Sequence, residues 1–223
     1  MTPDIGTDDT GPTTAIPPFR PARLPGLHIP AEALTRQGVR QYLRPVDFFN
    51  LCLTEAVLSF VCKYTNMNAE LVGMQKPSIY RTWEPIDVDT LRRFIGLVIY
   101  MGVVKAPNVE RYWSTKPLYH GLWSRRFMTK LRFKQIMCFL KLCNPNIQVA
   151  PENKLHKVEL LYKFVKARCK ALYQPGQNIC VDERMVANKG RYNFRQYMKD
   201  KPVKWGMKIW KDKCGRLAIW SRI

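Results

Sequence analysis

The sequence predicts an α+β fold, with a mostly helical part followed by antiparallel β-strands. Apolar residues recur every three or four positions over most of residues 45–173, which is the spacing of amphipathic helices. After Pro175-Gly176 the apolar residues alternate with polar ones, as they do in strands. Residues 1–42 show neither pattern. The sequence therefore divides into a tail at 1–42, a helical region at 43–176 and a β-rich region at 177–223.

The tail is expected to be disordered, because prolines interrupt any regular element and apolar periodicity is absent. Its charge changes from acidic near Asp4 to basic near Arg36. The prolines of the tail are Pro3, Pro12, Pro17, Pro18, Pro21, Pro25 and Pro30.

Five helices are expected in the helical region. Asp47 is placed as the N-cap of the first, Asp87 or Asp89 as the N-cap of the second, and Thr129 at the start of the fourth. The last helix is rich in Lys and Arg, which form either a solvated face or a DNA-facing surface. The expected ranges are 47–66, 87–102, 107–113, 129–144 and 153–173.

The β-rich region is expected to hold three strands at 179–186, 203–210 and 217–220, with a turn at 211–215. A three-stranded sheet without covering helices is a poor independent unit. The pattern therefore predicts a sheet that is unfinished where the sequence ends.

Charge is the most informative bulk property of the chain. The formal net charge is +20 and the isoelectric point is near 9.9. Such an excess attracts polyanions, because each neutralised phosphate releases counterions. DNA or RNA is therefore favoured as a partner over an acidic protein or a lipid surface. A ribosome-like or merely basic soluble protein remains the alternative that charge does not exclude.

Two further features concern the cellular location. The longest apolar run, Phe94 to Val104, is too short to span a bilayer, so no membrane partner is expected. The cysteine count of seven is odd, and no secretory leader precedes the first of them. These features favour reduced thiols in a cytosolic or nuclear protein.

The segment from Asn178 to Lys208 has the most specific pattern in the chain. A carboxylate pair, Asp182-Glu183, stands among apolar neighbours, where an acid is costly unless it is paired or binds a metal. Aromatic residues including Tyr197 and Trp205 are interleaved with cations, which suits stacking on bases and contact with phosphates. Asp182 either serves metal-assisted phosphodiester chemistry or forms a salt bridge. The cations chosen as DNA-binding are Lys189, Arg191, Arg195, Lys199, Lys201, Lys204 and Lys208.

This segment resembles the signature of piggyBac-type transposases. The acid-bearing strand matches Val181-Asp182-Glu183, and the KPxKWGxK block matches the stretch from Lys201 to Lys208. The resemblance runs from about Asp47 to Trp220, and its motifs arrive in the order that the family has. The other matching blocks are Gly190-Arg191, Gln196-Tyr197, Phe94-Ile95-Gly96-Leu97 with Tyr100-Met101-Gly102, Tyr112-Trp113-Ser114, the stretch from Met128 to Phe133 and the stretch from Leu142 to Asn144.

The resemblance implies a helical dimerisation and DNA-binding domain at 43–176 and the start of an RNase H-like domain at 177–223. In the intact family, three aspartates hold two divalent ions, usually Mg²⁺, for strand cleavage and transfer at TTAA sites. Asp182 matches the first aspartate, and it is a metal ligand only if other residues complete the site. A nuclear location and a possible homodimer follow from the same resemblance.

The sequence ends at Ile223, before the family's second and third aspartates and its C-terminal zinc module. One carboxylate cannot fix two metal ions. We therefore expect a transposase-derived protein that binds DNA with little sequence preference, holds no cofactor of its own and does not cleave DNA. The alternatives are a fragment or splice product of an active cut-and-paste transposase, and a remnant without a selected function.

Overall fold

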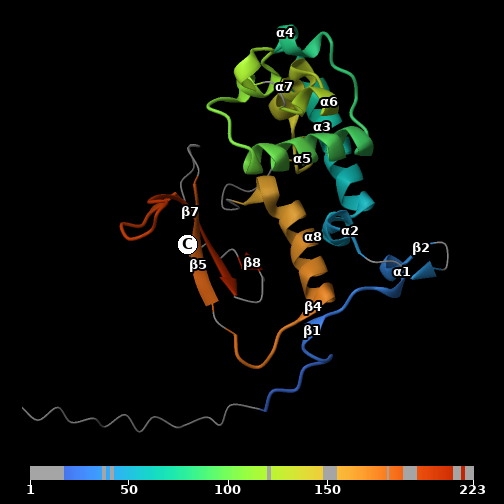
Figure 1. The fold of residues 1–223 in the computed structure, drawn as a ribbon, viewed down its shortest axis with the longest axis vertical. Helices are drawn as coiled ribbons and strands as arrows, with labels where there is room; N and C mark the ends of the chain where they lie inside the picture. The colour runs from blue at the N-terminus through green and yellow to red at the C-terminus, as the bar shows by residue number, and fades with distance from the viewer. Residues whose placement is uncertain are drawn as a thin grey trace, which may run out of the picture.

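The computed structural model describes residues 18–36, 39–40, 43–119, 122–147, 155–179, 181–187, 195–212 and 217–218. Helices dominate the first part and strands the last, which confirms the predicted α+β class (Figure 1). The elements are β1 (Gly26–Leu27), α1 (Ala31–Leu34), β2 (Thr35–Arg36), β3 (Val39–Arg40), α2 (Pro45–Cys52), α3 (Glu55–Gly73), α4 (Pro77–Tyr80), α5 (Val88–Val103), η1 (Val109–Trp113), η2 (Pro117–Tyr119), α6 (Ser124–Phe127), α7 (Lys130–Phe139), α8 (His156–Leu172), β4 (Tyr173–Gln174), β5 (Val181–Ala187), β6 (Gln196–Tyr197), β7 (Trp205–Asp212) and β8 (Leu217–Ala218).

Two predicted helix starts agree with the structure because their caps are local. The backbone N–H of Thr90 donates to Asp87 Oδ1 at 2.8 Å, so Asp87 is the N-cap of α5. The N–H of Arg132 donates to Thr129 Oγ1 at 3.2 Å at the start of α7. The hydrogen bonds from Thr90 also hold the pKa of Asp87 below its ordinary value.

The prediction of one helix over 47–66 is wrong. The chain forms α2 and α3, which meet at a bend of 64°. Asp47 is the third residue of α2 and not its N-cap, and its carboxylate accepts the backbone N–H of Arg44 at 2.8 Å. The helix stops because Leu53 leaves the helical region with ψ 76°, and Thr54 then starts α3.

No described helix is by itself long and apolar enough to cross a membrane, although α2 and α3 taken as one bent pair meet the criteria of length and composition.

The C-terminus of α7 is set by side chains from α3. Asn68 Nδ2 donates to the carbonyl of Phe139 at 2.9 Å, and the N–H of Lys141 donates to Thr65 Oγ1 at 3.2 Å. These bonds satisfy backbone groups at the helix end. As a result α7 ends at Phe139, before the Asn144-Pro145 end that the sequence predicts.

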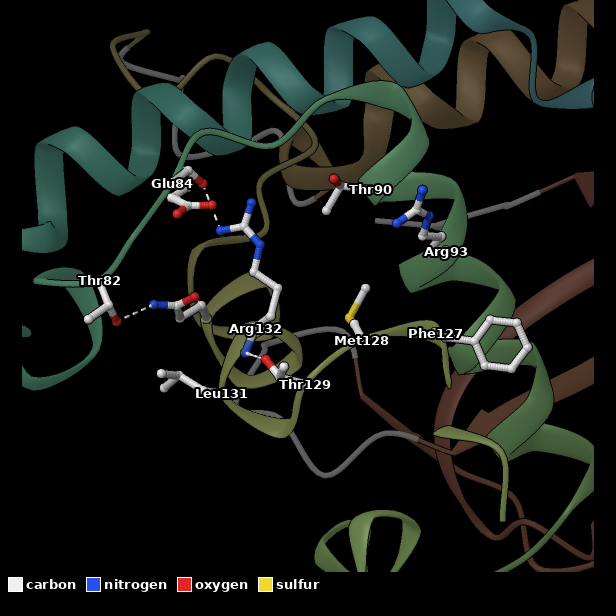
Figure 2. A pocket seen from close by; sticks show the side chains of 10 residues that line it. Thr82, Glu84, Thr90, Arg93, Phe127, Met128, Thr129, Leu131 and Arg132 are labelled. Carbon is white, nitrogen blue, oxygen red and sulfur yellow. Dashed lines mark hydrogen bonds between the residues drawn. The ribbon is translucent and has the colours of Figure 1, made fainter. Parts of the chain in front are cut away.

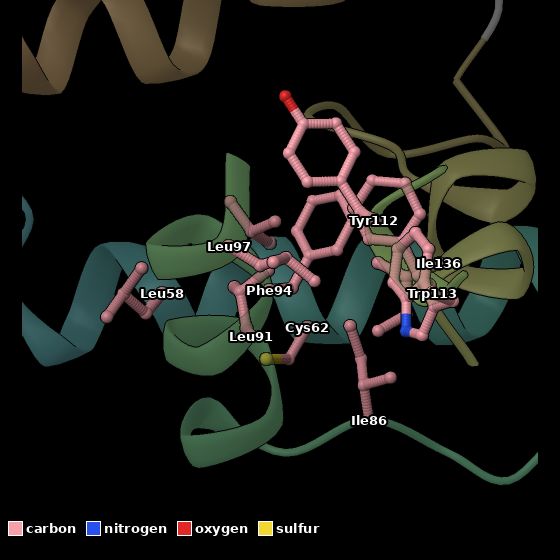
Figure 3. Close-up of a cluster of buried hydrophobic side chains, with 11 residues drawn as sticks. Leu58, Cys62, Ile86, Leu91, Phe94, Leu97, Tyr112, Trp113 and Ile136 are labelled. Atoms are coloured by element: carbon pink, nitrogen blue, oxygen red, sulfur yellow. The ribbon is translucent and has the colours of Figure 1, made fainter. Parts of the chain in front are cut away.

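The core of the helical part joins α3, α5, η1 and α7 (Figure 3). Phe133 lies at its centre, with its ring centroid 5.3 Å from that of Phe94 and 5.1 Å from that of Trp113. The indole N–H of Trp113 donates to the carbonyl of Met128 at 2.9 Å, so the ring is buried without an unsatisfied donor. Burial raises the pKa of the Cys62 thiol to about 11, which keeps it protonated at neutral pH.

Helix α8 packs against α2 and α3 through its apolar side. The rings of Phe164 and Phe60 stack with centroids 5.8 Å apart. Arg168 Nε donates to the carbonyl of Leu51, the penultimate residue of α2, at 2.7 Å. Helix α8 thus carries the chain away from the helical core to β4, and the loop that follows leads to β5 (Figure 1).

The sheet is built around β7. Strand β5 pairs antiparallel with β7 along its whole length, from Val181 opposite Asp212 to Ala187 opposite Gly206. Strands β6 and β8 also pair with β7, along the edge of β7 that faces away from β5. The sequence predicts three of these four strands and misses β6. It also predicts a turn from residue 211, whereas β7 continues to Asp212.

Part of the segment predicted to be a disordered tail is ordered against α8. Strand β1 pairs antiparallel with β4, with Gly26 opposite Gln174 and Leu27 opposite Tyr173. Helix α1 and strand β2 follow within the same segment. The expectation of disorder therefore does not fit residues 18–36, because the end of α8 offers backbone partners that no local pattern reveals. Residues 1–17, 37–38 and 41–42 lie outside the described part.

A test of this architecture uses Asn66, whose amide binds both backbone groups of Ile86. The N–H of Ile86 donates to Asn66 Oδ1 at 2.8 Å, and Asn66 Nδ2 donates to the Ile86 carbonyl at 3.0 Å. Asn66→Ala should lower the free energy of unfolding by about 2–4 kcal/mol, because both groups beside the buried Ile86 lose their partners. Chemical denaturation measures this loss. Asn66→Asp keeps the acceptor and should cost less; an equal cost would show that the bond accepted from the Ile86 N–H contributes nothing.

Candidate nucleic-acid interface

An aromatic cluster stands exposed on the β6–β7 hairpin. Tyr197 and Trp205 are register partners, with ring centroids 4.8 Å apart. The guanidinium carbon of Arg195 lies 4.8 Å from the Trp205 ring centroid. Trp205 remains 52% exposed and Tyr197 50% exposed. We call Arg195, Tyr197 and Trp205 the Trp205 platform; such a surface can stack on a nucleic-acid base.

The loop that joins β6 to β7, next to this platform, carries three lysines. The loop is closed by the N–H of Met198, which donates to the Lys204 carbonyl at 2.8 Å. Lys199 and Lys204 are exposed, whereas Lys201 is half-buried. The structure therefore brings four of the predicted cations together: Arg195, Lys199, Lys201 and Lys204.

The remaining predicted cations are not in this group. Lys208 is half-buried in β7, with its backbone opposite Met185 of β5. Lys189 and Arg191 lie outside the described residues. The platform itself combines three residues that the sequence singled out, but their cross-strand contact needed β6, which the sequence did not predict.

The hairpin is held to β5 by a close backbone approach at Gly206. A Cβ at this position would overlap the carbonyl group of Val186, with its carbon at 2.8 Å, and would lie 3.3 Å from the N atom of Ala187. Only glycine lacks that atom. The glycine of the KWG motif therefore allows β7 to lie directly beside β5.

Asp182, the predicted catalytic and metal-binding residue, lies within β5. Its backbone is opposite Lys211, and that of Glu183 is opposite Trp210. The described residues contain no group of three or more His, Cys, Asp or Glu side chains that could hold a metal ion. They therefore supply no donor set against which Mg²⁺ can be fitted, and we derive no step that involves a metal.

The basic side chains of α8 differ in their partners and exposure. Arg168 is committed to the carbonyl of Leu51, and Lys163 forms an ion pair with Glu159 at 2.6 Å. Lys163, Lys166 and Lys170 are exposed and share one side of the helix by their spacing. We call these three residues the α8 basic face. Lys154, predicted in the same helix, lies outside the described residues.

The helical part contains a hollow of about 410 Å³ between α5, α7 and the loop before α5 (Figure 2). Arg132 points across it and donates to the carbonyls of Glu84 at 2.7 Å and Pro85 at 3.3 Å. Gln135 Nε2 donates to Thr82 Oγ1 and to the Ile79 carbonyl, each at 3.0 Å. Burial lowers the pKa of Arg132. These groups hold the loop in place, so the hollow is a structural junction and not the candidate site.

Comparisons with known proteins agree on one family. Residues 44–215 match the family model described as Transposase IS4. The chain is 25% identical over 175 residues to human PiggyBac transposable element-derived protein 3, covering 78% of this chain and 28% of that protein. It is 24% identical over 183 residues to human PiggyBac transposable element-derived protein 2, covering 78% of this chain and 28% of that protein.

The fold is similar to a chain in the cryo-EM structure of the piggyBac transposase synaptic complex with hairpin DNA. The TM-score is 0.60 at 23% identity, over 75% of this chain and 35% of that chain. This chain thus spans 28% of the length of those two curated relatives and 35% of the solved one.

A substitution at Gly206 tests how the hairpin is positioned. In Gly206→Ala the added Cβ would overlap the backbone carbonyl of Val186, so β7 should move away from β5 at this point. Hydrogen exchange of the β5 and β7 amides should therefore rise. Hydrogen exchange read by mass spectrometry measures the change. Gly176→Ala is the matched control, since a Cβ there meets nothing within 4 Å. Equal exchange in the two variants would contradict the close approach.

Proposed function

The chain belongs to the piggyBac-type transposase family, and on that premise we propose that it binds DNA through the β6–β7 hairpin. The Trp205 platform is the observation that carries this proposal, because it combines exposed aromatic rings with exposed cations on one hairpin. Cations contact phosphates, and aromatic rings stack on bases wherever a base is accessible.

The expected binding is largely independent of DNA sequence. Phosphate contacts position a protein on DNA but carry no base information. The net charge of +20 provides a long-range attraction that salt screens. Stacking on aromatic rings adds affinity but little selectivity, since every base has a π-face.

The α8 basic face supplies a second set of phosphate contacts in this proposal. Lys166 and Lys170 are exposed, and Glu159, the one carboxylate within the sequence of α8, pairs with Lys163. The side that carries these lysines is opposite the apolar side packed on α2 and α3. A nuclear location and self-association into a homodimer belong to the same proposal, since both follow from family membership and from DNA as the partner.

Removing the loop lysines tests the proposal. A variant with Lys199→Gln and Lys204→Gln should bind DNA more weakly, and the slope of log affinity against log salt should fall in magnitude by about 2, because each phosphate contact contributes about 0.9. Fluorescence anisotropy with several unrelated duplexes at several salt concentrations measures both quantities. Similar affinity for all duplexes is expected.

The matched control removes two exposed lysines from loops of the helical part, by Lys105→Gln with Lys116→Gln. Both double variants lose the same charge, so a difference between them isolates the hairpin. Equal losses in the two variants, or a strong preference for one duplex, would overturn the proposal.

DNA cleavage is a second candidate function, favoured by family membership together with Asp182 in β5. The family's chemistry requires several carboxylates around two metal ions, as the resemblance implies. The proposed function, by contrast, requires only that the chain binds DNA, with no carboxylate taking part. Asp182→Asn separates the two candidates, since it removes a carboxylate from a basic neighbourhood without removing a cation.

Under the DNA-binding proposal, Asp182→Asn should bind duplex DNA as tightly as the wild type or slightly more tightly, because a negative charge that repels phosphate is gone. Neither protein should nick a TTAA-flanked substrate in Mg²⁺. Gel analysis of the substrate after incubation with each protein is the measurement. Nicking by the wild type that disappears in Asp182→Asn would make the chain a nuclease.

A further inference from the structure

The C-terminal end of α8 is held by a segment far away in the sequence. Arg23 Nη1 donates to the carbonyl of Ala171 at 2.6 Å, and Nη2 donates to that of Lys170 at 2.9 Å. The N–H of His28 donates to the carbonyl of Leu172 at 2.7 Å. Three consecutive carbonyls in the last turn thus receive donors from residues 23–28, which we call the clasp.

The physical basis of this contact is the exposed end of a helix. The last carbonyls of an α-helix have no intrahelical partner, and the helix dipole places negative potential there. A guanidinium satisfies both needs, because it supplies two N–H donors in a fixed geometry as well as a positive charge. The contact between Arg23 and α8 is therefore more than chance proximity of two surface groups.

The clasp continues as a strand pair. Gly26 lies opposite Gln174 and Leu27 opposite Tyr173 in the β1–β4 ladder. Gly26 has φ of +134°, a conformation that residues with a side chain rarely adopt. The ring of His28 also contacts the Leu24 carbonyl at 2.8 Å, which fixes the clasp internally.

The position of the clasp matters because α8 and the sheet are joined at this point. Tyr173 and Gln174 begin the connection that leads from α8 into β5 (Figure 1). Beyond β4 this connection includes Pro175 and Gly176 and has no regular structure through Ile179. By pairing with its first two residues, the clasp determines the direction in which the connection leaves the helix.

We propose that the clasp is a positioning device that sets the direction of the connection from α8 toward β5, so that one DNA duplex contacts both the α8 basic face and the Trp205 platform. This inference rests on the proposed function. Two linked surfaces that bind the same ligand gain affinity only when the connection lets both engage together. Arg23 acts through the geometry of the connection and not through its own contact with DNA.

The central experiment compares Arg23→Gln with Arg20→Gln. Arg20 and Arg23 are both exposed and lie three residues apart, so each variant loses one positive charge from the same segment. Hydrogen exchange should rise at residues 26–28 and 173–174 in Arg23→Gln and stay at the wild-type level in Arg20→Gln. The DNA affinity of Arg23→Gln should be about threefold to tenfold below that of Arg20→Gln, because the second surface engages less effectively.

A second pair of variants removes the clasp without changing charge. Gly26→Ala strains the backbone at φ +134°, whereas Gly176→Ala places a Cβ in open space. Gly26→Ala should reproduce both effects of Arg23→Gln, and Gly176→Ala should reproduce neither. Circular dichroism melting checks that the helical core of every variant is intact.

The possible outcomes separate the two proposals. Unchanged exchange at residues 26–28 and 173–174 in Arg23→Gln overturns the clasp. Raised exchange with the affinity of Arg20→Gln shows a clasp that does not couple the two surfaces, which overturns the inference and leaves the proposed function intact. Failure of the wild type to bind DNA overturns both.

Discussion

The antiparallel ladder between β5 and β7 determines where the Trp205 platform and Asp182 lie. It starts with Val181 opposite Asp212 and ends with Ala187 opposite Gly206. Trp205 immediately precedes the last pair, so the platform stands where the ladder ends. Asp182 lies next to the other end of the same ladder. A shift of one residue in the pairing would turn each side chain to the opposite face of the sheet, which makes this register the constraint on both sites.

Polar residues in the helical part serve a different purpose from those in the hairpin. Asn66, Asn68 and Gln135 donate to backbone carbonyls of loops and helix ends that are remote in sequence. Arg132 does the same and also covers the ring of Trp83 at 4.9 Å. These side chains already have partners that stabilise the fold. In the hairpin, by contrast, Lys199 and Lys204 are exposed, which leaves them accessible to an external anion.

The sequence predicts the features that depend on local chemistry. The helix starts near Asp87 and Thr129 were found because each of these side chains binds an N–H three residues later. The cations that the sequence chose as DNA-binding include four at the β6–β7 hairpin because they cluster in one short segment, and their binding role stays a prediction. The end of α7 was missed because Asn68, which binds Phe139, is 71 positions away. The clasp was missed for the same reason, since Arg23 and Ala171 are 148 positions apart. The role of Arg168, one of the cations of the last helix left open between a solvated face and a DNA-facing surface, was missed because its partner, the Leu51 carbonyl, cannot be recognised from sequence.

The lysines beside Trp205, rather than the exposure of its ring, favour the proposed nucleic-acid partner over a protein partner. A half-exposed tryptophan leaves apolar area in water that burial would have stabilised by roughly 25 cal/mol per Å². The contact with Arg195 recovers only about 0.5–1 kcal/mol at an exposed site. The platform therefore favours any partner that covers it. Protein interfaces are depleted in lysine, because an ammonium group is costly to desolvate. Lys199 and Lys204 beside the platform raise that cost for a protein, whereas phosphates would neutralise them while a sugar or base covers the rings.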